Sequence, residues 1–265
     1  MKTCIVVGAK GFIGSALAAE AAARGYALTA VDLDNYAECR GTEADLLINA
    51  AGNSRKFIDA RDPVKGFELS VASVMHALHD FRYGFYVQLS SGAIYPHEDD
   101  PRLNGEDAPL PLSEMTGYGF HKWMAEQLVR HFAPRHLILR MGGFVGPGLR
   151  KNAMFDLLTQ RPLFVHPDSE FQYMDTRELA RCVFRLYEED SPPAPILNLS
   201  STGTVSVRQA AEWAGRELPA DAQAHPKVRA ELNVDNAARR IALPTTRETV
   251  RQFIREVQAG KVRLP

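Results

Sequence analysis

A run of seven residues near the amino terminus, GAKGFIG, limits what this chain can fold into more than any other feature. It follows a short apolar, β-branched segment, Thr3–Val7, and precedes an alanine-rich segment that extends from about residue 12 to residue 24. A short apolar run that stops at glycine is typical of a buried parallel strand, and the alanine-rich segment predicts a helix that Gly25 ends. A strand, a glycine turn and a helix in direct succession predict the first half of a βαβ unit.

The glycines of this turn also indicate a ligand. They are spaced G-x-x-G-x-x-G rather than G-x-G-x-x-G. Glycines permit a tight turn and let the backbone approach a pyrophosphate, while the N-terminus of the following helix offers unpaired N–H groups to the anion. We therefore expect a dinucleotide to contact the residues of this turn, which are Gly8, Lys10, Gly11, Phe12, Ile13 and Gly14.

Strand-like and helix-like segments alternate through the first half of the chain. The predicted strands are 28–31, 45–49, 85–90 and 136–141, and the predicted helices include 63–81 and 117–132. This alternation predicts an α/β fold with a parallel, doubly wound, Rossmann-like sheet. Asp62 followed by Pro63 is a typical helix start, because Asp supplies an N-cap acceptor and Pro presets φ at the first turn. The proline-rich sequence SPPAP, residues 191–195, predicts a surface connector.

Tyr118 and Lys122 are the strongest candidates for catalysis. Residues four apart on a helix lie on the same face, so a phenol and an ammonium can share one site there. The cation would lower the tyrosine pKa from about 10 toward the operating pH, as a general acid or base requires. Such a pair alone is common on helices. Here it follows both the glycine turn and Ser91, at the end of a predicted strand, and all three are requirements of hydride-transfer chemistry.

Asp32 follows the second predicted strand, eighteen residues after Gly14. A carboxylate at that position accepts hydrogen bonds from ribose hydroxyls and repels a 2′-phosphate, which favours NAD over NADP. Lys10 argues in the other direction, because a cation in the turn could meet a 2′-phosphate. The alternative interpretation of Asp32 is a solvated loop acid beside Asp34.

Composition excludes several function classes. A net charge of -1 over 265 residues predicts neither nucleic-acid nor acidic-membrane binding. The start MKTCIVVG enters a predicted strand directly, so we expect neither a signal peptide nor a membrane span, and we expect a cytoplasmic protein whose three cysteines are reduced. His97 and His121 are expected in surface or capping roles, without a carboxylate or metal partner. His76 and His79 show no third ligand, so no metal site is expected.

Several segments together resemble the extended short-chain dehydrogenase/reductases, also called the NAD-dependent epimerase/dehydratase family. Besides the glycine turn and YGFHK, the resemblance is carried by DLLINAAG, LSSGAIYP, LILRMGGFVGPG, YMDTRELA and LNLSSTGTVSVRQAAE. It implies that Ser91 hydrogen-bonds the reacting oxygen, that Tyr118 is the acid/base, and that Lys122 binds the nicotinamide ribose and tunes Tyr118. It also implies that the turn of Ala50, Ala51 and Gly52 lies over the cofactor.

The resemblance has implications for organisation as well. It implies a cofactor domain of residues 1–145 and 163–200, a small substrate-binding lobe of residues 146–162 and 201–265, and a homodimer formed through the two long helices. The implied substrate is a small molecule, a sugar or nucleotide sugar.

The chain departs from the family pattern at informative positions. Gly92 and Ala93 replace the acidic residues of the family's 4,6-dehydratases, which disfavours dehydration. Gly143 stands near the place of an asparagine that grips sugar nucleotides, and Phe171 or Gln172 replaces an arginine that contacts pyrophosphate. Whether the substrate carries a nucleotide diphosphate therefore stays open.

Two hypotheses follow. The first is an NAD(P)-dependent oxidoreductase or epimerase that acts on a sugar hydroxyl or ketone; the residues do not separate reductase from epimerase. The alternative is a non-catalytic Rossmann protein that binds the dinucleotide as a sensor or binds a partner. Retention of Ser91, Tyr118 and Lys122 together favours the enzyme.

Overall fold

The computed structural model describes residues 1–54, 56–189 and 195–265. The predicted connector SPPAP, apart from Pro195, lies outside these residues. The chain forms two compact units. The first comprises Met1–Pro96, Glu106–Met141 and Ala180–Leu197, and the second comprises His97–Gly105, Gly142–Leu179 and Asn198–Pro265. In the described part of the chain, no helix combines the length and apolar character needed to cross a bilayer.

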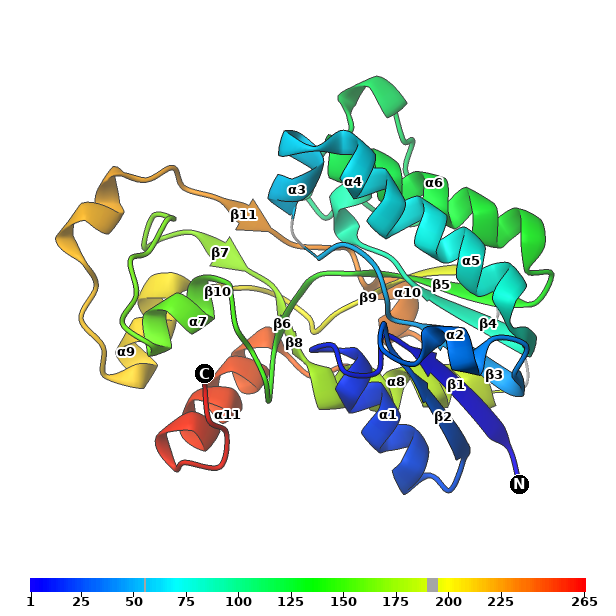
Figure 1. Ribbon diagram of the computed structural model, residues 1–265. Helices are drawn as coiled ribbons and strands as arrows, with labels where there is room; N and C mark the ends of the chain where they lie inside the picture. Colours follow the sequence, from blue (N-terminus) through cyan, green and yellow to red (C-terminus); the bar gives the residue numbers. More distant parts are fainter. Residues whose placement is uncertain (55, 190–194) are drawn as a thin grey trace. The chain divides into compact units, whose positions relative to one another are not determined.

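A six-stranded sheet forms the centre of the first unit (Figure 1). Its strands are β1 (Thr3–Val7), β2 (Ala27–Val31), β3 (Glu43–Asn49), β4 (Arg82–Leu89), β5 (His136–Met141) and β9 (Ile196–Leu199), in the order β2-β1-β3-β4-β5-β9. The pairs β1–β2, β1–β3, β3–β4 and β4–β5 are all parallel. Because β2 and β3 lie on opposite sides of β1, the strand order reverses beside β1, and ligands bind at such a switch point in open α/β sheets. The predicted fold class is confirmed.

Helices cover both faces of this sheet, with α1 on one face and α4, α5 and α6 together on the other (Figure 1). The helical elements are α1 (Gly14–Ala23), α2 (Tyr36–Cys39), α3 (Lys56–Arg61), α4 (Pro63–Phe67), α5 (Ser73–Asp80), α6 (Gly117–Phe132), α8 (Thr176–Glu188) and the 3₁₀ turns η2 (Gly92–Ile94) and η3 (Leu112–Glu114). The predicted start at Asp62 is confirmed, since its carboxylate accepts a bond from the Lys65 N–H at 2.9 Å.

The single regular helix predicted over residues 63–81 is interrupted. A π-helical segment, η1 (Glu68–Ala72), separates α4 from α5. The wider i→i+5 hydrogen bonds accommodate an extra residue in one turn, and π segments occur frequently at functional sites. Apolar periodicity alone does not distinguish such a segment from an α-helix, which explains why the pattern predicted one continuous helix.

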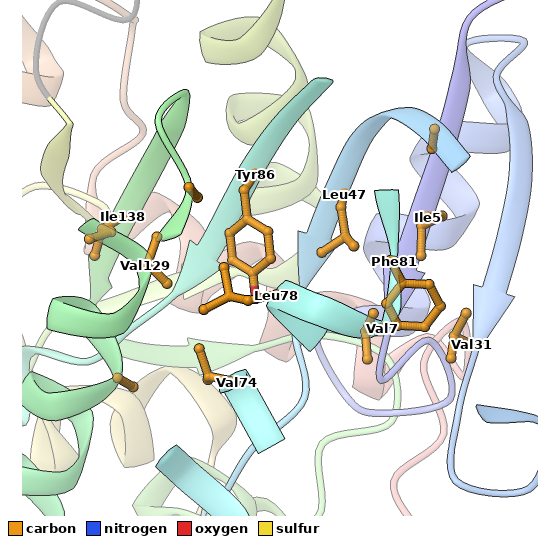
Figure 2. Close-up of a cluster of buried hydrophobic side chains, with 13 residues drawn as sticks. Ile5, Val7, Val31, Leu47, Val74, Leu78, Phe81, Tyr86, Val129 and Ile138 are labelled. Atoms are coloured by element: carbon orange, nitrogen blue, oxygen red, sulfur yellow. The ribbon is translucent and has the colours of Figure 1, made fainter. Parts of the chain in front are cut away.

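The core of the first unit lies between the sheet and helices α5 and α6 (Figure 2). Strand residues such as Ile5, Leu47 and Ile138 meet helix residues such as Leu78 and Val129, and all are almost fully inaccessible to solvent. Burial of this apolar surface stabilises the sheet by roughly 25 cal/mol per Å². The sheet and α6 therefore hold fixed positions for the residues at the strand ends.

The second unit contains two small sheets. In one, β6 (Gly143–Val145) pairs with β8 (Tyr173–Asp175); the other has the order β10 (Val205–Ser206), β7 (Glu170–Phe171), β11 (Arg229–Ala230). Its helical elements are α7 (Ala153–Leu158), α9 (Val207–Ala214), η4 (Ala220–Ala224), α10 (Asp235–Ala238) and α11 (Thr246–Gln258). Capping boxes begin both α9, at Ser206 with Gln209, and α11, at Thr245 with Glu248.

Candidate active site

The glycine turn after β1 is packed too closely for other residues. Gly8 has φ of +81°, and a Cβ there would lie 2.9 Å from the Ala51 nitrogen. A Cβ on Gly14, at the start of α1, would lie only 2.0 Å from the Gly8 oxygen. Glycine at both positions lets the first turn of α1 approach the end of β1, beside the switch point of the sheet. Within the turn, the N–H groups of Gly8 and Ala9 donate to the Val31 oxygen and that of Gly11 donates to the Gly8 oxygen.

Asp32 lies at the end of β2 and is held against the glycine turn. Its carboxylate accepts hydrogen bonds from the Lys10 N–H and the Leu33 N–H, both at 2.8 Å. The Lys10 ammonium forms an ion pair with Asp34, and the hydrogen bond that it donates to this carboxylate raises the lysine pKa. The structure therefore brings Asp32 to the turn through the backbone of Lys10, while the side chain of Lys10 is engaged by a different acid.

The turn after β3 connects the glycine turn to α6. The Ala50 N–H donates to the Val7 oxygen at 2.9 Å, and the Ala51 N–H donates to the buried side-chain oxygen of Asn49 at 3.1 Å. Gly52 follows with φ of +134°, and a Cβ there would lie 3.5 Å from the Lys122 Nζ. The predicted cofactor-binding turn 50–52 therefore touches the glycine turn at one end and the lysine at the other.

Tyr118 and Lys122 lie in the first two turns of α6. Thr116 caps this helix by accepting a hydrogen bond from the Gly119 N–H at 3.1 Å. Tyr118 is 8% exposed and Lys122 is 7% exposed, and the Lys122 Nζ lies 5.8 Å from the centroid of the Tyr118 ring. Burial lowers the pKa of Lys122 to about 8, against the opposing effect of the carboxylates of Glu126 and Asp59. The structure brings the predicted phenol and ammonium together in a buried place.

Ser91 caps the 3₁₀ turn η2 at the end of β4. Its Oγ accepts a hydrogen bond from the Ala93 N–H at 3.2 Å. Helix α6 packs directly on this turn, because a Cβ on Gly119 would lie 2.2 Å from the Ala93 oxygen. Gly119 is therefore required for the close approach of the helix that carries Tyr118 to the turn that carries Ser91.

A buried charged network joins α6 to β5 and was not predicted from the sequence. Glu126, in α6, is fully inaccessible to solvent and pairs with Arg140, in β5, at 2.8 Å. The Glu126 carboxylate also accepts from the Ser90 hydroxyl at 2.5 Å, and Arg140 donates to the Tyr95 hydroxyl at 2.8 Å. One signal pointed to it: an arginine inside the apolar strand sequence LILRM needs a buried anion as partner.

The expectation that His121 has no carboxylate partner was wrong. His121 is 7% exposed, and its Nδ1 lies 2.6 Å from the carboxylate of Asp59, which is 3% exposed. The two residues are 62 positions apart in the sequence, so no local spacing predicts the pair. His97 is exposed at the surface. Among the residues that the structure describes, no group of three or more His, Cys, Asp or Glu side chains is arranged to hold a metal ion.

A parallel sheet with a glycine turn at its switch point defines the Rossmann-like class of α/β proteins. The family model described as "NAD dependent epimerase/dehydratase family" matches residues 4–199. The chain belongs to the NAD-dependent epimerase/dehydratase family, as the sequence resemblance predicted.

Solved structures with the same fold are similar over nearly their whole length. A UDP-galactose 4-epimerase is 22% identical with a TM-score of 0.75, covering 97% of this chain and 99% of the other. A dTDP-4-dehydrorhamnose reductase from Bacillus anthracis, in complex with NADP, is 16% identical with a TM-score of 0.76, covering 96% and 98%. MoeE5, in complex with UDP-glucuronic acid and NAD, is 19% identical with a TM-score of 0.76, covering 97% and 99%. Among curated protein sequences, none is significantly similar to this chain.

Proposed function

We propose that this protein is an NAD-dependent oxidoreductase or epimerase that acts on a hydroxyl or ketone of a sugar or nucleotide sugar through Ser91, Tyr118 and Lys122. One observation carries the proposal: the Lys122 ammonium is buried 5.8 Å from the centre of the Tyr118 ring and beside Gly52, in the turn that touches the glycine turn. A buried cation beside a phenol is the arrangement that an acid/base tyrosine requires.

The residues present fit a nicotinamide dinucleotide. Gly8 and Gly14 let the turn pack closely against the 50–52 turn and the start of α1, and a glycine turn ahead of a helix N-terminus suits a pyrophosphate. We assign cofactor binding to Gly8, Lys10, Gly11, Phe12, Ile13, Gly14, Asp32, Ala50, Ala51, Gly52, Tyr118 and Lys122. Asp32 supports NAD over NADP, because its carboxylate repels a 2′-phosphate and the Lys10 ammonium is already paired with Asp34.

In the proposed mechanism, the nicotinamide ring supplies the acceptor or donor of the hydride. The chain's own residues manage the proton. Tyr118, as a phenolate, takes the proton of the substrate hydroxyl, or as a phenol returns it to a ketone oxygen. Lys122 favours the ionised phenol through its positive charge, and Ser91 holds the substrate oxygen by a hydrogen bond.

The substrate class follows from family membership and from what the relatives bind. MoeE5 was solved with UDP-glucuronic acid and with UDP-glucose, which supports a sugar nucleotide for this chain. Gly92 and Ala93, after the serine turn, carry no acid for a dehydration step, which supports oxidation, reduction or epimerisation. We assign the cofactor to residues 1–145 and 163–200 and the substrate to the lobe of residues 146–162 and 201–265. A cytoplasmic homodimer completes the proposal, and sedimentation of the purified protein would test the dimer.

The test is the Tyr118→Phe variant. We expect turnover to fall about 10²-fold or more while NAD binding is kept, because the ring remains and only the proton-exchanging oxygen is lost. Turnover is measured with a panel of sugar nucleotides by the absorbance of reduced nicotinamide and by product analysis, and NAD binding by fluorescence titration. Tyr83→Phe is the matched control, since its hydroxyl donates to the Leu78 oxygen and has no role in the proposed chemistry.

Each outcome of this experiment has a definite meaning. Near-normal turnover in Tyr118→Phe would contradict the assignment. Net consumption of NAD indicates a dehydrogenase, whereas inversion without net consumption indicates an epimerase. A wild-type protein that binds NAD but converts none of the panel would support the alternative of a non-catalytic dinucleotide sensor.

A further inference from the structure

Asp59, in α3, carries a buried carboxylate that contacts α6 and has no role in the proposed chemistry. The residue is 3% exposed, and its two carboxylate oxygens are bound by the His121 Nδ1, at 2.6 Å, and by the Asn53 side-chain amide. A Cβ on Gly66, in α4, would lie 2.5 Å from this carboxylate, and a Cβ on Gly117, in α6, would lie 3.7 Å from the Asp59 backbone oxygen. Helices α4 and α6 therefore both meet Asp59 of α3, and the close approach of α4 depends on Gly66.

The partners of Asp59 belong to the two segments that meet at Lys122, helix α6 and the turn after β3. His121 directly precedes Lys122 in α6, and Asn53 directly follows Gly52. A Cβ on Gly52 would lie 3.5 Å from the Lys122 Nζ. The bonds His121–Asp59 and Asp59–Asn53 thus tie the 50–53 turn to α6 around the lysine. A buried negative charge favours the protonated form of a buried amine, and the carboxylates of Glu126 and then Asp59 counter the lowering of the Lys122 pKa by burial.

The other charged and titratable groups around Lys122 are accounted for by their own partners. On α6 itself, Glu126 is paired with Arg140 of β5, and Tyr118 is the phenol of the proposed site. From the α4–η1 segment, Lys65 and Glu68 form an exposed ion pair with each other. On α5, Asp80 binds the hydroxyl of Tyr36 at 3.1 Å and lies within ion-pair reach of Arg40 and His76. Asp59 is the carboxylate near Lys122 that no arginine or lysine pairs among these described contacts.

We propose that Asp59, held by His121 and Asn53, is a positioning residue that keeps Lys122 cationic and orients it toward Tyr118. The inference rests on the proposed function of Tyr118 and Lys122 in α6 and adds to it one charged residue of helix α3. Asp59 does not touch the reacting atoms. It acts through Lys122, whose positive charge favours the ionised form of Tyr118.

The experiment measures Lys122 directly. In protein labelled with carbon-13 at the lysine Cε, the Lys122 signal is identified by its loss in Lys122→Met and followed against pH. We expect a wild-type midpoint of about 8 and, in Asp59→Asn, a midpoint lower by about one pH unit. The Lys122 midpoint should fall in Asp59→Asn whether His121 is charged or neutral, because the substitution removes one negative charge in either case. An unchanged midpoint in Asp59→Asn overturns the proposal.

Two further variants separate charge from packing. Glu114→Gln removes one exposed carboxylate and should leave the midpoint unchanged. His121→Gln keeps the Asp59 carboxylate and supplies another donor to it, so the midpoint should remain close to that of the wild type. A midpoint that falls as far in His121→Gln as in Asp59→Asn shows that packing, and not charge, is responsible, and this also overturns the proposal.

A measurement on the unmodified protein covers the case in which Asp59→Asn does not fold. The carbon-13 signal of the Asp59 carboxyl group, assigned through its backbone, should shift at the pH where Lys122 loses its proton, because the two groups interact through charge; a signal that does not change there overturns the proposal. None of these readouts needs a substrate. If Tyr118→Phe keeps normal turnover, the proposed function fails while the titration results stand, and if only the midpoints fail to move, this inference alone is rejected.

Discussion

Lys122 is a charged group that folding takes out of water. Burial lowers its pKa from 10.5 to about 8, so in the folded protein it releases its proton well before it does so in the unfolded chain. Between these two pH values the unfolded state binds more protons than the folded state, and stability therefore rises with pH in that window. Below pH 8 the lysine is charged in both states, and its burial costs on the order of 3 kcal/mol.

The variant Lys122→Met tests this cost. The methionine fills a similar volume without a charge, so we expect it to unfold at higher urea concentration than the wild type at pH 7. The difference in free energy of unfolding should shrink between pH 8 and pH 10.5, as the wild-type lysine loses its charge. Urea unfolding of both proteins at several pH values measures the difference, and other titrating groups cancel in the comparison. Two stability curves that run parallel from pH 7 to pH 10.5 would contradict the pKa shift.

At the scale of elements, the contact between α6 and η2 depends on one glycine. In Gly119→Ala the new Cβ would meet the Ala93 oxygen at 2.2 Å, which forces α6 away from the turn that carries Ser91. We expect a loss of about 1–3 kcal/mol in the free energy of unfolding and a lower turnover. Gly117→Ala is the matched control in the same helix, because its Cβ would meet the nearest atoms at 3.7 and 3.9 Å. If Gly119→Ala is as stable as Gly117→Ala, the contact does not constrain the helix.

Most elements were predictable because their signals are local. Strand β5 and helix α6 begin and end at the predicted residues, His136–Met141 and Gly117–Phe132. Strand β4 starts three residues before the predicted 85–90, since Arg82, Tyr83 and Gly84 lack the apolar pattern of its buried half. The π segment in the predicted helix 63–81 was not predicted, because its backbone geometry leaves no mark in residue periodicity.

At the scale of the whole molecule, the sequence predicted side chains whose partners lie nearby in the chain or follow strand ends. Tyr118 and Lys122 share a helix, and Asp32 follows β2 beside the glycine turn, so their proximity was foreseeable. The buried pairs Asp59–His121 and Glu126–Arg140 were not, because the packing of helices on the sheet brings their members together. A single sequence carries no signal for those pairings beyond the need of each buried charge for a partner.

The preference for NAD or NADP can be measured from the increase in Tm that each cofactor produces. A ligand that binds only the folded state stabilises it by about 2.7 kcal/mol at a hundred times its Kd, which raises Tm by several degrees in a chain of this size. We expect NAD to raise Tm more than NADP at equal concentration. Asp32→Ser should abolish that difference, whereas Asp34→Ser, which releases the Lys10 ammonium, should increase the effect of NADP. A larger shift with NADP in the wild type would contradict the preference for NAD.

The two hydrogen bonds that hold Asp32 have a consequence for how a ligand would arrive. The carboxylate is immobilised by the N–H groups of Lys10 and Leu33 before any ligand is present. Its loss of rotational freedom therefore belongs to folding, and an incoming ribose would not have to restrict it again. Because the carboxylate is preorganised, a nucleotide that fits it poorly would dissociate quickly, since Asp32 could not move to accommodate it.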